Sequence, residues 1–205
     1  MRNNYVGLNH NLIVVTMDSE FVVKKKPKES EAIIFLGKGE IAKIKKHEDF
    51  TFKLISHKDK QEWILSNIVD GQRRPFSYVV RKTRKNDSNP QEGQEVFIVR
   101  EQLFQHNGKF YMLASHPEGK SWKDYIRSST RYVSRLDNLP YSNLADVDHG
   151  HYTLRHKIKR LRGIPVGEAE GLGQEEAGHH VRLDKELEDI GLFVAAISYL
   201  LYASG

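Results

Sequence analysis

The chain has 205 residues, a net charge of +5 and no cysteine. Its length is enough for one sizeable core or two small domains, and its 39% hydrophobic and 29% charged residues are typical of a globular protein. Structural disulfides, thiolate catalysis and cysteine-ligated metal sites are excluded.

The first half of the sequence predicts β-structure. Short runs of branched and aromatic residues, separated by turn-like pieces, are typical of an antiparallel meander. They fall at residues 12–17, 20–25, 32–37, 40–45, 50–55, 76–82, 95–105 and 109–115. Asn107-Gly108 indicates a tight hairpin, because both residues tolerate positive φ. One helix is expected near residues 58–70, with Trp63, Ile64 and Ile68 buried and Gly71 at its end.

From Ser121 onward the apolar spacing favours helices. Two basic amphipathic helices are expected, at 121–138 and 152–163, followed by a Gly- and Glu-rich loop at 163–180. The last helix, at 182–203, is apolar nearly all round, so we expect it in the core or in an oligomer interface. The predicted fold class is therefore α+β: an antiparallel β-rich portion at 1–117 and a mostly helical portion at 118–205, which could share one core.

Charge is distributed unevenly along the chain. Residues 120–162 contain ten Lys and Arg against four Asp and Glu, whereas residues 163–205 contain two against eight. A concentrated positive surface is a physical reason to bind phosphates or an acidic partner. The candidate anion-binding residues are Arg127, Arg131, Arg135, Arg155, Lys157, Lys159, Arg160 and Arg162. The competing interpretation is that these cations form a solvated face, paired with the acidic C-terminal segment.

This pattern predicts a non-enzymatic binding or assembly protein that engages nucleic acid or an acidic protein. A structural subunit of a larger complex is a further alternative. In the binding or assembly protein, the apolar helix at 182–203 would support packing or self-association into a homo-oligomer.

A second class of function rests on the segment from Asp146 to His156. Imidazole and carboxylate groups are proper ligands for zinc, iron or manganese. If a metal is bound, Asp148, His149 and His151 are the candidate ligands, and the chain would be a metal-dependent hydrolase or nuclease. The spacing matches no defined metal signature. No catalytic residue and no cofactor is predicted.

The sequence predicts a cytoplasmic, intracellular protein. Its first residues lack the apolar core of a signal peptide. The longest apolar run, at 190–203, is too short to span a bilayer comfortably.

Overall fold

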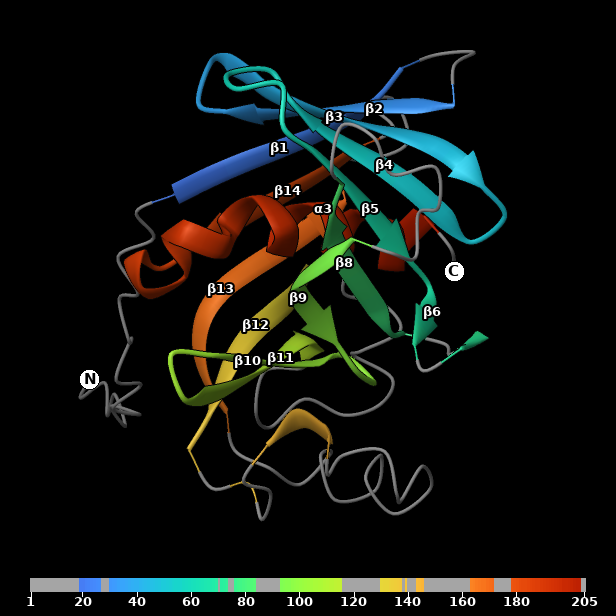
Figure 1. Ribbon diagram of the computed structural model, residues 1–205. Helices are drawn as coiled ribbons and strands as arrows, with labels where there is room; N and C mark the ends of the chain where they lie inside the picture. The colour runs from blue at the N-terminus through green and yellow to red at the C-terminus, as the bar shows by residue number, and fades with distance from the viewer. Residues whose placement is uncertain are drawn as a thin grey trace, which may run out of the picture.

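The computed structural model describes ten stretches of the chain, which form a mostly antiparallel β-fold with a C-terminal α-helix (Figure 1). The described residues are 19–26, 30–69, 71–73, 76–83, 93–115, 130–137, 139, 143–145, 163–171 and 178–203. The strands are β1 Ser19–Lys25, β2 Glu31–Leu36, β3 Gly39–Glu48, β4 Thr51–Ser56, β5 Glu62–Ser66, β6 Ile68–Val69, β7 Gln72–Arg73, β8 Tyr78–Lys82, β9 Gln94–Val99, β10 Leu103–His106, β11 Lys109–Ser115, β12 Thr130–Leu136, β13 Gly163–Gly171 and β14 Gly178–Leu183. A 3₁₀ helix, η2 (Lys185–Ile190), leads into the α-helix α3 (Gly191–Ala203).

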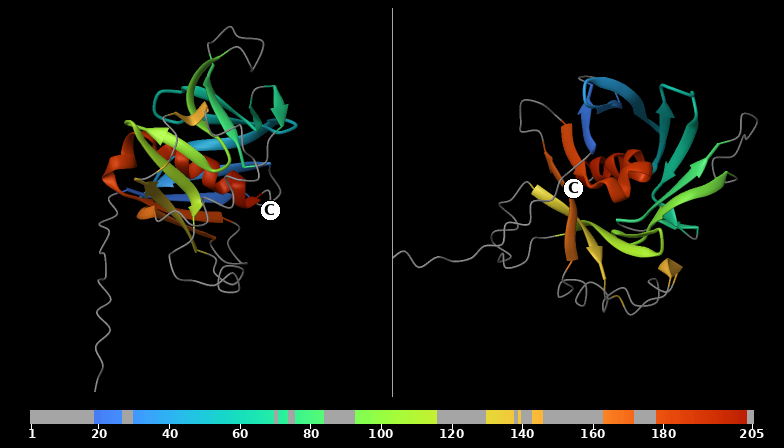
Figure 2. Two further views of the ribbon diagram at one scale, coloured as in Figure 1. Left: turned by 90° about the horizontal axis from the view of Figure 1, so that it is seen from below. Right: turned by 90° about the vertical axis from the view of Figure 1, so that its left-hand side faces the viewer.

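Twelve of the strands form one sheet that wraps around α3. Its order is β10-β11-β12-β13-β14-β1-β2-β3-β4-β5-β8-β9, and β6 and β7 form a separate hairpin. The two edge strands meet at a bridge between Arg100 and Leu103, so the sheet is a nearly closed cylinder. Figure 2 shows this cylinder end-on, with α3 inside it.

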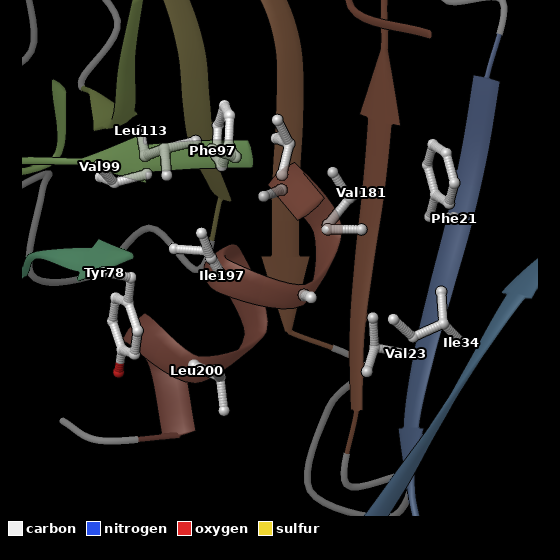
Figure 3. Packing of buried hydrophobic residues seen from close by; sticks show 14 of the residues in the cluster. Phe21, Val23, Ile34, Tyr78, Phe97, Val99, Leu113, Val181, Ile197 and Leu200 are labelled. Carbon is white, nitrogen blue, oxygen red and sulfur yellow. The ribbon is translucent and has the colours of Figure 1, made fainter. Parts of the chain in front are cut away.

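The interior is filled because inward side chains alternate along the strands and the helix is apolar on every side. Ile34 and Leu54 are buried completely on the wall, as are Ala195 and Ile197 on α3. These side chains belong to one cluster, part of which is shown in Figure 3. The cluster draws on strands from both sides of residue 117, and β14 pairs with β1. The cylinder is therefore a packed core rather than a hollow carrier.

Aromatic rings join the helix to the wall where the two edge strands meet. Phe193 of α3 lies 5.4 Å from Trp63 and 5.9 Å from Phe97, measured between ring centroids. Phe97 of β9 in turn contacts Phe104 of β10 at 5.3 Å, and Phe104 stacks on Tyr111 at 5.0 Å. Side-chain packing thus closes the cylinder where the ladder of backbone hydrogen bonds is weakest.

The predicted α+β class is wrong, because the described residues of the predicted helical portion include three strands of the sheet, β12, β13 and β14. Residues 130–136 of the first basic helix form β12, and residues 163–171 of the predicted loop form β13. The predicted helix near 58–70 is also wrong, since residues 62–66 form β5 within the sheet. The strand at 12–17 and the helix at 152–163 lie outside the described residues, apart from Gly163 at the start of β13.

Other expectations are confirmed. The hairpin at Asn107-Gly108 is present, with φ of 47° and 74° at the two turn residues. The C-terminal helix lies in the core, although it begins at Gly191 because Arg182 belongs to β14 and residues 185–190 form η2. Asp184 caps η2 by accepting a hydrogen bond from the backbone N–H of Glu186 at 3.2 Å. Among the described helices, none has the length and apolar character required to cross a bilayer.

Candidate anion-binding surface

The predicted arginine surface is not a helix face in the structure. Arg131 and Arg135 lie on β12, and at the register shift between Val133 and Ser134 the extra residue, Val166, belongs to β13, so the alternation of β12 is unbroken. Their four-residue spacing keeps both on one side of the strand, but that side is in register with the buried residues Ala169 of β13 and Tyr111 of β11 and is not the outer surface of the cylinder. The other predicted anion-binding residues lie outside the described parts of the chain; they are Arg127, Arg155, Lys157, Lys159, Arg160 and Arg162.

Arg135 is engaged by carboxylates. Its Nη1 lies 3.0 Å from Oε2 of Glu186, and its Nε lies 3.1 Å from Oδ1 of Asp137. Lys109 Nζ also reaches Glu186, at 3.4 Å, and His106 Nε2 lies 3.0 Å from Asp189 Oδ1. Arg135 is therefore paired with the acidic C-terminal segment, which was the alternative to anion binding. This ion pair holds η2 against β12.

A second network of ion pairs lies across β1, β13 and β14. His180 Nε2 is 2.6 Å from Oε1 of Glu20, and Arg182 contacts both Glu20 and Glu168. The hydrogen bond from His180 holds the pKa of the Glu20 carboxyl below its ordinary value. These carboxylates neutralise Arg182 of β14, so this part of the surface offers little net positive charge.

The lysines of β1, β3 and β4 form a different surface, here called the lysine face. Lys43 and Lys45 alternate on β3 with Ala42 and Ile44, which are buried, so the two lysines lie on the outer side of the sheet. In the sheet, Lys45 pairs with Lys53 of β4. Ile33 of β2 pairs with Lys24 of β1 on one side and with Lys43 of β3 on the other. The cations of the lysine face are Lys24, Lys26, Lys43, Lys45 and Lys53. Lys25 and Lys46 instead lie in register with Ala32 and Phe52, on the inner side at the ends of their strands.

Carboxylates offset only part of this charge. Glu31 pairs with Lys45 and lies 3.7 Å from Lys26, and the neighbouring Lys cations hold the pKa of its carboxyl below the ordinary value. Lys53 lies 3.0 Å from Glu62 at the edge of the face. Cations outnumber carboxylates along these described strands, which leaves a net positive surface.

The sequence interpretation overlooked this surface. Its signals were the runs VVKKK at 22–26 and KIKK at 43–46, in which lysine follows or alternates with apolar residues. Each run is short and ordinary on a strand. Only the pairing of β1 with β2, and of β3 with β2 and β4, brings the two runs together.

The candidate metal ligands Asp148, His149 and His151 lie outside the described residues, as do Asp146 and His156. Within the described stretches, no group of three or more His, Asp or Glu side chains is arranged to hold a metal ion.

Comparisons with known proteins give no further guide. No protein-family model, no curated protein and no solved structure matches this chain.

Proposed function

We propose that this chain is a non-enzymatic binding protein that engages an anionic macromolecule through the lysine face. The observation that carries this proposal is the registered array of lysines on β1, β3 and β4, which is rigid because the sheet beneath it packs on α3. A rigid cationic array attracts polyanions by charge and by the release of their counterions.

The filled interior supports a surface function. The space that a ligand-carrying cylinder would leave open is taken here by α3, whose Val194, Ala196 and Ile197 side chains are fully buried. Recognition would then have to take place on the outer wall, at the turns or at the ends of the cylinder.

The test compares two triple variants of equal charge. Lys24→Gln, Lys43→Gln and Lys45→Gln together remove three cations from the lysine face. Lys38→Gln, Lys58→Gln and Lys60→Gln remove three exposed cations from the β2–β3 and β4–β5 turns, at the other end of the strands. Both sets change the net charge equally, so any difference reports position rather than total charge.

Binding would be measured by fluorescence anisotropy with labelled nucleic acid and with an acidic polypeptide at two salt concentrations. We expect salt-sensitive binding to at least one probe. We also expect the lysine-face variant to weaken it and to flatten its salt dependence by about 0.7–0.9 logarithmic units for each phosphate that the variant no longer neutralises. The absence of binding at low salt, or equal weakening by both variants, would overturn the proposal.

A further inference from the structure

Two exposed phenylalanines lie at the end of the cylinder that carries Lys45 and Lys46. Phe50 occupies the turn between β3 and β4 and is 41% exposed, and Phe76 precedes β8 and is 39% exposed. Large aromatic side chains are ordinarily used to fill a core. Here the rings of Trp63, Phe97 and Phe104 serve that purpose, whereas these two lie at the surface.

The backbone holds both residues in an unfavourable conformation. Phe50 has φ of 63° and Phe76 has φ of 58°, in the left-handed region that glycine and asparagine normally occupy. Glu101 and Gln102, which follow β9 at the same end, also have positive φ, of 49° and 72°. Strained residues gathered at one place are a reason to look for a function there.

Hydrogen bonds connect these strained segments into one rim. Asn67 donates its backbone N–H to the carbonyl oxygen of Phe50 at 2.8 Å and its side-chain Nδ2–H to the carbonyl oxygen of Ser77 at 2.9 Å. Gln102 donates its backbone N–H to the carbonyl oxygen of Phe76 at 2.9 Å, and Glu101 donates to Oγ of Ser77 at 3.0 Å. The two phenylalanines therefore stand on a connected frame rather than on independent loops.

A guanidinium group lies against one of the exposed rings. Arg73, on the β6–β7 hairpin that follows β5 (Figure 1), places its Cζ 3.7 Å from the ring centroid of Phe50. This is a cation–π contact. It sets a planar cation beside an aromatic ring, which is the pair of groups that stacks on unpaired bases.

Lysines flank this rim. Lys45 of the lysine face lies at the end of β3 nearest to Phe50. Lys25 and Lys46, which pair with Ala32 of β2 and Phe52 of β4, lie at the same end of the cylinder. The acidic groups Glu48 and Asp49 lie at the same turn, so the charge is mixed locally. Aromatic faces and a flanking row of cations together fit a flexible polyanion that carries planar groups.

We infer that the rim of Phe50, Phe76 and Arg73 binds a single-stranded nucleic acid, whose bases stack on the rings while its phosphates follow the lysine face. The inference rests on the proposed function, because the lysine face supplies the attraction for phosphates. A single strand fits better than a duplex, since the bases of a duplex are stacked on one another and do not present their planes to a protein. An acidic polypeptide would satisfy the lysines but would leave the aromatic rings unexplained.

The test removes the rings without straining the backbone. Phe50→Gly and Phe76→Gly, singly and together, place glycine at positions of positive φ, where it is readily accommodated. Asn107→Gly is the matched control, because it makes the same kind of change at a positive φ in the β10–β11 hairpin, at the other end of the strands. Leu36→Ala controls for the loss of an exposed apolar side chain, since Leu36 is 43% exposed.

The probes are labelled single-stranded DNA and RNA of about 15 nucleotides, close to the upper site size of single-strand binders, the matching duplexes, and poly-glutamate. With the full chain, we expect single strands to bind more tightly than duplexes. Each phenylalanine variant should weaken single-strand binding about 5- to 100-fold at every salt concentration, because one base no longer has a ring to stack on. The slope of affinity against salt should stay unchanged, since the groups that bind phosphate are all retained.

The outcomes separate this inference from the proposed function. If the phenylalanine variants bind like the control variants while the lysine-face variant weakens binding, the rim inference fails and the proposed function stands. If poly-glutamate binds best and depends on the rings, the partner is an acidic protein segment and the nucleic-acid inference is overturned. If the lysine-face variant has no effect either, both proposals fail.

Discussion

The helix inside the cylinder and the rim at its end use apolar residues in opposite ways. On α3 the side chains of Ala195, Ala196 and Ile197 are fully buried, and the surrounding strands supply their contacts. At the rim, Phe50 and Phe76 expose about two fifths of their surface and adopt positive φ. Burial of the α3 side chains stabilises the fold, which accounts for their apolar character. Stability does not account for two exposed phenylalanines in a strained backbone conformation. The comparison therefore separates the residues that hold the fold from those available for binding.

The largest expected effect lies inside the cylinder. Ile197→Ala should lower the free energy of unfolding by about 2–5 kcal/mol, because it removes buried methylene groups and leaves a cavity beside the strands. Ile164→Ala is the matched control, since Ile164 on β13 is 40% exposed, and it should cost about 0.5 kcal/mol or less. Both values would come from urea denaturation. Similar destabilisation by the two variants would contradict the assignment of α3 to the core.

An intermediate effect is expected from a histidine on the inner face of β14. His179 is only 1% exposed, and burial, together with the neighbouring His180, lowers its pKa from the ordinary 6.5 to about 4. The unfolded chain therefore binds more protons than the folded chain between these two pH values. The free energy of unfolding is therefore highest above pH 6.5, and the contribution of His179 to it decreases as the pH falls toward 4.

Between pH 7 and pH 5 this histidine should reduce the free energy of unfolding by about 2 kcal/mol. His179→Leu should remove that part of the pH dependence, whereas His47→Gln, at an exposed position of β3, should retain it. Denaturation curves at the two pH values measure both. An unchanged pH dependence in His179→Leu would show that another group is responsible.

The smallest effect is expected at the rim, where strain and stability can be compared directly. Phe50→Gly should change the free energy of unfolding by less than about 1 kcal/mol, because the relief of the left-handed strain offsets both the removal of the ring from Arg73 and the greater freedom of the unfolded chain. Phe50→Val should be less stable than Phe50→Gly by at least about 1 kcal/mol, since a β-branched residue tolerates positive φ poorly. Equal stability of the two variants would mean that the turn rearranges freely and holds no strained conformation.

The alternation of apolar and polar residues predicted most strands of the first half, because every second side chain of a half-buried strand faces the core. The predicted helix near 58–70 fails for a related reason. Ile64 lies between Lys53 and Arg81 in register on the outer side, yet it is only 2% exposed, while Leu65 is buried on the inner side. Long cationic side chains can cover an outward apolar residue. Two consecutive apolar residues, Ile64 and Leu65, are therefore both buried in a strand, and in the sequence they resemble the apolar stripe of a helix.

The arginine stripe was misinterpreted because a spacing of four residues suits both a helix and a strand. Arg131 and Arg135 are separated by one helical turn, or by two repeats of a strand. The glycines of residues 163–171 were taken as signs of a loop, although they permit close packing. A Cβ on Gly167 would lie 2.7 Å from Cδ2 of Leu183 and 2.8 Å from the carbonyl oxygen of Arg182. In β13, glycine is required by the neighbouring strand.

Local periodicity and composition were enough to predict most strands of the first half, the Asn107-Gly108 hairpin and a C-terminal helix too apolar to face water. Long-range contacts were needed to close the sheet around that helix, to pair Arg135 with Glu186, and to bring the lysines of β1, β3 and β4 beside one another. The reason is physical: which strands become neighbours depends on contacts between residues far apart in the chain. A pattern read within one short window does not contain that information.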